Sequence, residues 1–176
     1  MINLLKQFAR PLVCRFPSLL HFYRVRRDSK FRDVQPRRTP YGFLLTGNEQ
    51  MMDGSFEPVE TEIIRKLLLN NDIFINVGAN IGYYVCHAIH SGLQAVAIEP
   101  HPANVDYLLK NIKANGFEKN VEVHHVAVSD SKCVVELFGT GTGASLVPGW
   151  AGSPTSKGHS VFASTLDDII GERFTG

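Results

Sequence analysis

Two patterns of hydrophobic and polar residues, one typical of strands and one typical of helices, alternate along the middle of this chain. Together they predict an α/β fold. Short apolar runs rich in β-branched residues are typical of strands that are buried on both faces of a parallel sheet. Such runs occupy residues 73–77, 94–98 and 121–128. Apolar residues at helical spacing mark three helices, at residues 58–69, 83–90 and 102–115. We therefore expect a mostly parallel sheet that is flanked by helices.

The helix expected at residues 58–69 carries a wide apolar face. Its apolar positions follow the spacing i, i+4, i+5, i+8 and i+9, which places them on one side of a helix. These positions are Val59, Ile63, Ile64, Leu67 and Leu68. We expect the whole of this face to be buried.

Weaker signals predict the elements on either side of this core. Residues 41–46, 133–138 and 160–163 have the composition of short strands, and Thr165 followed by Asp168 resembles a capping box at the start of a helix. Residues 139–158 hold six glycines. Long loops of this kind are commonly functional lids or disordered, and Trp150 is the one aromatic residue of this loop that could anchor it.

Length and composition predict one globular domain. The chain has 176 residues, 44% of them hydrophobic, and no apolar run approaches the roughly 20 residues of a membrane span. Its three cysteines are widely spaced and form no C-x-x-C pair, which predicts neither a disulfide framework nor a structural zinc site. We expect a cytoplasmic protein without a metal.

Charge divides the chain into two parts. Residues 1–40 hold ten Lys or Arg and two Asp, a net charge of +8, whereas residues 41–176 carry −7. A basic extension of this kind is compatible with a nucleic-acid or anionic-membrane arm. No binding motif accompanies the charge, so we favour an extension that docks on the domain at residues 41–176, with its charges in solvent.

A glycine turn and an acidic residue carry the candidate chemistry. The turn Gly78-Ala79-Asn80-Ile81-Gly82 lies between a strand and a helix, where a ligand can approach bare backbone and the N–H groups of the helix start. Glu99 ends the next strand, 21 positions after Gly78. An acidic residue about 20 positions after such a turn typically holds the hydroxyls of a ribose. The pair predicts a ligand that contains adenosine.

The spacing of the glycines narrows the choice of ligand. A dinucleotide fingerprint would need glycine at positions 80 and 83, where the chain has Asn80 and Tyr83, and no P-loop motif occurs. The shorter turn suits a smaller group, such as the methionine part of S-adenosylmethionine. Glycines that serve only packing are one alternative, and an NAD-binding oxidoreductase is a more distant one.

Several stretches together resemble the FkbM family of S-adenosylmethionine-dependent methyltransferases. The glycine turn lies in VGANIGYY, which is followed by IEPHPANVDYLLKNIKANG. The lead-in GNEQMMDGSFEPVETEIIRKLL and the later GTGASLVPGW and STLDD are also similar to that family, so the resemblance covers about residues 41–170. It implies a Rossmann-like class I methyltransferase fold and a hydroxyl-bearing methyl acceptor.

The resemblance also implies a set of cofactor contacts. The turn would hold the methionine end, Glu99 the ribose, and the backbone near residues 127–128 the adenine. Asn76 stands where the family usually has an aspartate, so it keeps the polarity of that position and loses the charge. The expected cofactor-binding residues are Asn76, Gly78, Ala79, Asn80, Gly82, Tyr83, Glu99, Pro100, His101, Ala127 and Val128. No catalytic residue is predicted.

The family continues past TLDD into a further core strand, so we expect residues 41–176 to form the N-terminal part of a methyltransferase domain. The missing strand would lie beside residues 73–77, and an exposed apolar edge there would favour homo-oligomers or other association. The first functional hypothesis is an O-methyltransferase that acts on a small molecule, sugar or lipid. The alternative is a non-catalytic remnant, or a cofactor-binding module that acts through its basic arm.

Overall fold

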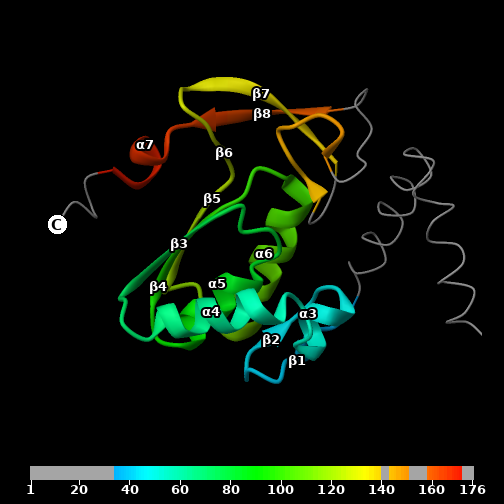
Figure 1. Cartoon of the computed structure of the whole chain (residues 1–176), viewed down its shortest axis with the longest axis vertical. Helices are drawn as coiled ribbons and strands as arrows, with labels where there is room; N and C mark the ends of the chain where they lie inside the picture. Colours follow the sequence, from blue (N-terminus) through cyan, green and yellow to red (C-terminus); the bar gives the residue numbers. More distant parts are fainter. Residues whose placement is uncertain (1–33, 140–142, 151–157, 172–176) are drawn as a thin grey trace, which may run out of the picture.

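The computed structural model describes residues 34–139, 143–150 and 158–171. Within them the chain is a mixed α/β structure with five helices, a parallel sheet, a mixed sheet and a short antiparallel ribbon (Figure 1). The expectations for residues 1–33 lie outside the described residues. The α/β class is confirmed, but the strands do not form one mostly parallel sheet.

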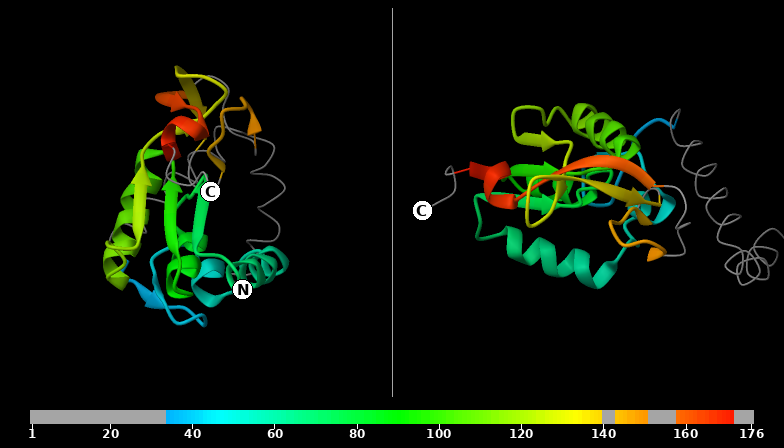
Figure 2. Two further views of the ribbon diagram at one scale, coloured as in Figure 1. Left: turned by 90° about the vertical axis from the view of Figure 1, so that its left-hand side faces the viewer. Right: turned by 90° about the horizontal axis from the view of Figure 1, so that it is seen from above.

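The first sheet is built from the apolar runs that the sequence marks most clearly. Its strands are β3 (Ile73–Val77), β4 (Gln94–Ile98) and β5 (Val121–His124), in the order β3-β4-β5 and all parallel. They run side by side in the left view of Figure 2. β4 is the central strand, and β3 forms one edge of this sheet.

Three helices pack against one face of this sheet. They are α4 (Pro58–Leu68), α5 (Tyr83–His90) and α6 (Pro102–Asn115), each within one residue of its expected bounds. Side chains of α5 and α6 meet over Ala95 and Ala97 of β4. Leu68 of α4 packs with Ala88 of α5 and Phe74 of β3. Residues in register on neighbouring strands direct their side chains to the same face of a sheet. Phe74 is in register with Ala95, so α4 covers the same face as α5 and α6.

A short antiparallel ribbon and one further helix precede α4. The ribbon joins β1 (Arg37–Arg38) to β2 (Leu44–Leu45), so it pairs residues on both sides of the expected boundary at residue 40. The helix α3 (Glu49–Asp53) was not predicted. The backbone N–H of Met51 in its first turn donates to Oδ1 of Asn48 at 2.8 Å, and Met51 and Met52 pack into the cluster beneath the helix.

The second sheet contains β6 (Ala127–Val128), β7 (Cys133–Phe138) and β8 (Gly158–Ser164), in the order β6-β8-β7. β6 is parallel and β7 antiparallel to β8. The prediction of one strand over residues 121–128 is therefore wrong, because the chain leaves the first sheet after β5 and enters the second at β6. The helix α7 (Leu166–Ile170) begins at the expected cap, where Thr165 Oγ1 accepts from the Asp168 backbone N–H at 3.1 Å.

Two side-chain expectations are corrected. The apolar face of α4 is only half covered, because Ile64 and Leu68 point inward whereas Val59, Ile63 and Leu67 are each more than half exposed. Trp150, the expected anchor of residues 139–158, is 58% exposed, and residues 140–142 and 151–157 of that loop lie outside the described residues.

Candidate functional site

The turn after β3 has the strained backbone that its glycines make possible. Gly78, Asn80 and Gly82 all lie in the left-handed region, with φ of 77°, 52° and 87°. Glycine adopts this conformation without a steric penalty, and asparagine is among the residues that tolerate it best. The turn is tied to the end of β4, because the backbone N–H groups of Gly78 and Ala79 both donate to the carbonyl of Ile98, at 2.9 and 3.0 Å.

The two glycines of the turn serve different purposes. A Cβ at Gly82 would lie 2.5 Å from Cδ1 of Leu108 on α6, so this glycine allows α6 to pack closely against the turn. A Cβ at Gly78 would meet no atom of the described residues within 4 Å. Packing therefore accounts for Gly82, whereas Gly78 leaves exposed backbone beside open space that a ligand can enter.

The Glu99 carboxylate joins the turn to the start of α6. Oε2 of Glu99 accepts a hydrogen bond from the backbone N–H of Asn80 at 2.7 Å. Oε1 accepts from the backbone N–H of His101 at 2.8 Å and from Nδ2 of Asn104 at 3.1 Å. Glu99 thus lies against the turn, although 19 positions separate it from Asn80.

Burial and hydrogen bonding act in opposite directions on the pKa of the Glu99 carboxyl group. The residue is 3% exposed, and this burial raises the pKa of its carboxyl group above the ordinary value. Hydrogen bonds from His101, Asn80 and Asn104 and the nearby His125 act in the opposite direction. A carboxylate offers about four acceptor sites, and three donors from the chain contact it, so Oε2 can still accept one hydroxyl of a ligand.

Several residues that were expected to contact the cofactor have side chains that lie within the core or within a strand. The Tyr83 side chain is buried in an aromatic cluster, where its ring lies 5.4 Å from that of Phe56. Ala79 is buried under α5 and α6. Asn76 lies in β3, in register with Ala97 of β4. Only the backbone of residues 79 and 83 is therefore placed to contact a ligand.

The remaining expected contacts lie around the ends of β5 and β6. The Pro100 carbonyl lies 3.0 Å from Nε2 of His125, and His101 is buried at the start of α6. Ala127 and Val128 belong to the second sheet, where β6 pairs with Ala163 and Ser164 of β8. Within the described residues, no strand pairs with the other side of β6.

Sequence reasoning missed two asparagines of α6, of which Asn111 holds the turn in place and Asn115 holds β2. Asn111 of α6 is fully buried, and its Nδ2 donates to the carbonyls of Ile81 at 2.8 Å and Thr46 at 3.1 Å. Its Oδ1 accepts from the Thr46 N–H at 2.7 Å. One turn later Asn115 makes the same pair of bonds with the backbone of Leu44, both at 2.7 Å. Two amides at i and i+4 on an apolar helix face were the available signal.

Comparison with protein-family models, with curated proteins and with solved structures finds no match for this chain. None of the described helices has the length and apolar character needed to cross a membrane. Within the described ranges, no group of three or more His, Cys, Asp or Glu side chains is placed to hold a metal ion. The functional argument therefore depends on the geometry of the turn and Glu99.

Proposed function

We propose that this chain binds S-adenosylmethionine at residues 78–82 and transfers the methyl group to a hydroxyl oxygen of a small molecule, sugar or lipid. The observation that carries the proposal is the hydrogen bond from the turn to Glu99 at the end of β4. A glycine turn after one parallel strand, with an acidic residue at the end of the next, is the arrangement that holds a nucleoside.

The chain's own groups fit the parts of this cofactor. The open space above Gly78 admits the methionine portion, and no side chain caps the start of α5 at Gly82. Backbone N–H groups at a helix start suit a carboxylate. Glu99 would accept one ribose hydroxyl through Oε2. Asn76 would offer a neutral amide at the methionine end, which predicts weaker binding than a carboxylate would give.

The reaction requires alignment more than it requires acid–base chemistry. S-adenosylmethionine supplies an electrophilic methyl group on a positively charged sulfur. The chain's task is to hold the acceptor hydroxyl in line with that bond and to exclude water. Positioning of this kind can contribute about 7–11 kcal/mol to a bimolecular reaction.

Titration calorimetry with S-adenosylmethionine and S-adenosylhomocysteine tests the proposal. We expect saturable binding, and we expect Glu99→Gln to weaken it at least tenfold, about 1.4 kcal/mol. Glu118→Gln, which changes an exposed glutamate, is the matched control and leaves the affinity unchanged. If the folded chain does not bind either compound, as judged with a cooperative thermal melt, the proposal is wrong.

A cofactor-binding module without turnover is the second candidate. One observation favours it: three donors of the chain already contact the Glu99 carboxylate, so a ribose would gain at most one hydrogen bond from it. Weak binding without methyl transfer to a panel of hydroxyl acceptors would select this function over the first.

A further inference from the structure

Glu57 has an unusual backbone conformation at the start of α4. Its φ of 42° lies in the left-handed region, and among the described residues only Asn80 of the glycine turn is another non-glycine residue with a positive φ. A residue that precedes a proline, as Glu57 precedes Pro58, normally has an extended backbone, and so does a residue at a helix N-cap. Non-glycine residues in the left-handed region occur preferentially at ligand sites. Glu57 thus departs from the geometry of an ordinary helix start.

The Glu57 side chain does not cap its own helix. Its carboxylate makes no capping hydrogen bond to α4. Instead, Oε2 accepts a hydrogen bond at 2.8 Å from the hydroxyl of Tyr84, a residue in the first turn of α5. Burial and this hydrogen bond raise the pKa of Tyr84 above its ordinary value, so the hydroxyl keeps its proton and acts as the donor. The carboxylate is therefore directed toward the helix that begins at the glycine turn.

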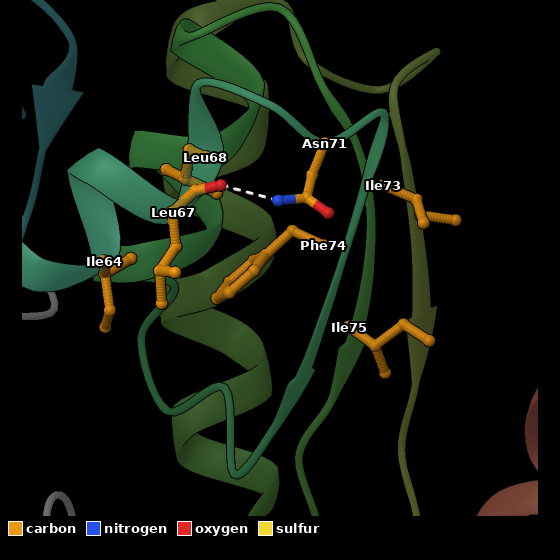
Figure 3. A pocket seen from close by; sticks show the side chains of 7 residues that line it. All are labelled: Ile64, Leu67, Leu68, Asn71, Ile73, Phe74 and Ile75. Atoms are coloured by element: carbon orange, nitrogen blue, oxygen red, sulfur yellow. Dashed lines mark hydrogen bonds between the residues drawn. The ribbon is translucent and has the colours of Figure 1, made fainter.

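Contacts at both ends of α4 hold Glu57 in this place. Next to Glu57, the Phe56 ring lies 5.4 Å from the ring of Tyr83 in the first turn of α5. At the other end of the helix, Leu68 packs with Phe74 of β3. Figure 3 shows both of these side chains among those that line the groove between the end of α4 and β3. A helix that is fixed at both ends keeps the Glu57 carboxylate beside the start of α5.

Within the described residues, no cation balances the charge of Glu57. Lys, Arg and His side chains there form ion pairs with other acidic residues and none with Glu57. Glu57 is also exposed, so a ligand can reach it. Asn76, which the proposed function places at the methionine end of the cofactor, is neutral. Glu57 is therefore placed to receive a positively charged group of a ligand.

We propose that Glu57 binds the α-ammonium group in the methionine part of the cofactor. The role of Glu57 rests on the proposed binding of S-adenosylmethionine at residues 78–82. A methionine carboxylate at the N–H groups that begin α5 brings the ammonium group close to the first turn of this helix, because both groups are attached to one carbon atom. Glu57 supplies there the negative charge that Asn76 lacks. The Tyr84 hydroxyl orients the carboxylate and leaves Oε1 to accept from the ammonium group.

Titration calorimetry of the full chain with three ligands tests this role. The ligands are S-adenosylhomocysteine, its deaminated analogue, which keeps the carboxylate and lacks the ammonium group, and 5′-methylthioadenosine, which lacks both groups. We expect Glu57→Gln to weaken the binding of S-adenosylhomocysteine roughly tenfold, because a hydrogen bond between two charged groups becomes a weaker one. The same change does not weaken the binding of the other two ligands. Glu60→Gln, on an exposed glutamate in the first turn of α4, is the matched control and changes none of the three affinities.

Two further variants separate the charge of Glu57 from its effect on folding. Glu57→Asp keeps the charge in a residue type that tolerates the left-handed backbone better, so it retains a preference for S-adenosylhomocysteine over the deaminated analogue. Tyr84→Phe removes the donor that orients the carboxylate and reduces this preference about threefold. A cooperative thermal melt of each variant verifies that it is folded.

The outcomes for Glu57 and for the proposed function can be told apart. If the unaltered chain binds S-adenosylhomocysteine no better than the deaminated analogue, or if Glu57→Gln weakens all three ligands equally or none of them, the role of Glu57 is wrong and the proposed function stands. If the unaltered, folded chain binds none of the three ligands, the proposed function is wrong and the role of Glu57 falls with it.

Discussion

The two sheets of this molecule differ in how completely they are covered. In the first sheet, the central strand β4 is buried from Ala95 to Ile98 under neighbouring strands and helices. In the second, β7 and β8 alternate between inward and outward side chains, and Val134 and Phe162 are mostly exposed. The candidate site is attached to the covered sheet, because Glu99 directly follows β4. A geometry that must be held to within an ångström thus lies on the more constrained of the two regions.

The largest effect on the covered region is expected from Asn111→Ala. This change leaves three buried backbone groups without their partners, one each at Thr46 N–H, Thr46 C=O and Ile81 C=O. We expect the free energy of unfolding to fall by roughly 4 kcal/mol in urea denaturation. Asn70→Ala, on an exposed loop residue, is the control and changes it by less than about 0.5 kcal/mol. Equal effects would mean that the amide does not hold the turn.

Gly82→Ala should be nearly as damaging, because the new methyl group would enter the space of Leu108 in a left-handed backbone. Overpacking and the backbone conformation together cost roughly 3 kcal/mol. Gly78→Ala meets only the backbone penalty of about 1–2 kcal/mol, since open space surrounds it. Urea denaturation of both variants separates the two effects. If Gly78→Ala proved the more costly, the assignment of packing to Gly82 would be wrong.

His87 makes the stability of the covered region depend on pH. It lies among the rings of Tyr41, Phe43 and Tyr83, and its buried Nε2 has no hydrogen-bond partner in the part of the chain that the structure describes. Burial, aided by the charges of Arg65 and His90, lowers the pKa of His87 from 6.5 to about 4. Below pH 6.5 the unfolded chain binds a proton at His87 and the folded chain does not, so the free energy of unfolding falls as the pH drops.

We expect this loss to reach up to about 3 kcal/mol between pH 6.5 and pH 4. His87→Phe preserves the aromatic packing and should remove most of the pH dependence in denaturation experiments at the two pH values. His90→Gln, on an exposed histidine of the same helix, should retain most of it, because burial is the largest cause of the lowered pKa of His87 and His90 is the smallest. An unchanged pH profile in His87→Phe would show that another group is responsible.

The smallest expected effect contrasts the two sheets directly. Val96→Ala, in β4, removes buried methyl groups and should cost about 2 kcal/mol. Val134→Ala makes the same change on the open side of β7 and should cost less than about 0.5 kcal/mol. Thermal unfolding of the two variants measures the contrast. Similar shifts would mean that the second sheet is covered in solution.

Elements with a long and regular pattern could be predicted from the sequence. The strands β3 and β4 and the helices α5 and α6 have their expected bounds, because their periodicity and their glycine or proline ends agree. α3 could not be predicted in this way. It is only five residues long, and what stabilises it is the packing of Met51 and Met52 and the cap at Asn48.

The candidate site was predicted in outline only. The spacing between the turn and Glu99 predicted that both belong to one ligand site. It could not predict that the chain itself would donate three hydrogen bonds to Glu99, because two of the donors, His101 and Asn104, become neighbours of the carboxylate only once α6 is folded. The exposed half of α4 could not be predicted either, since an apolar stripe has the same sequence pattern whether or not a partner covers it.

The close approach of Leu108 to Gly82 has a consequence for protein engineering. The Leu108 side chain fills the space into which a side chain at residue 82 would extend, although 26 positions separate the two residues. The two positions must therefore be varied together. A change at either position alone is expected to destabilise the chain, because a side chain at 82 collides with Leu108 and a smaller residue at 108 leaves a cavity. A smaller residue at 108 would relieve the collision but not the cost of the left-handed backbone at 82, so a library that varies both positions is expected to keep glycine at 82 most often.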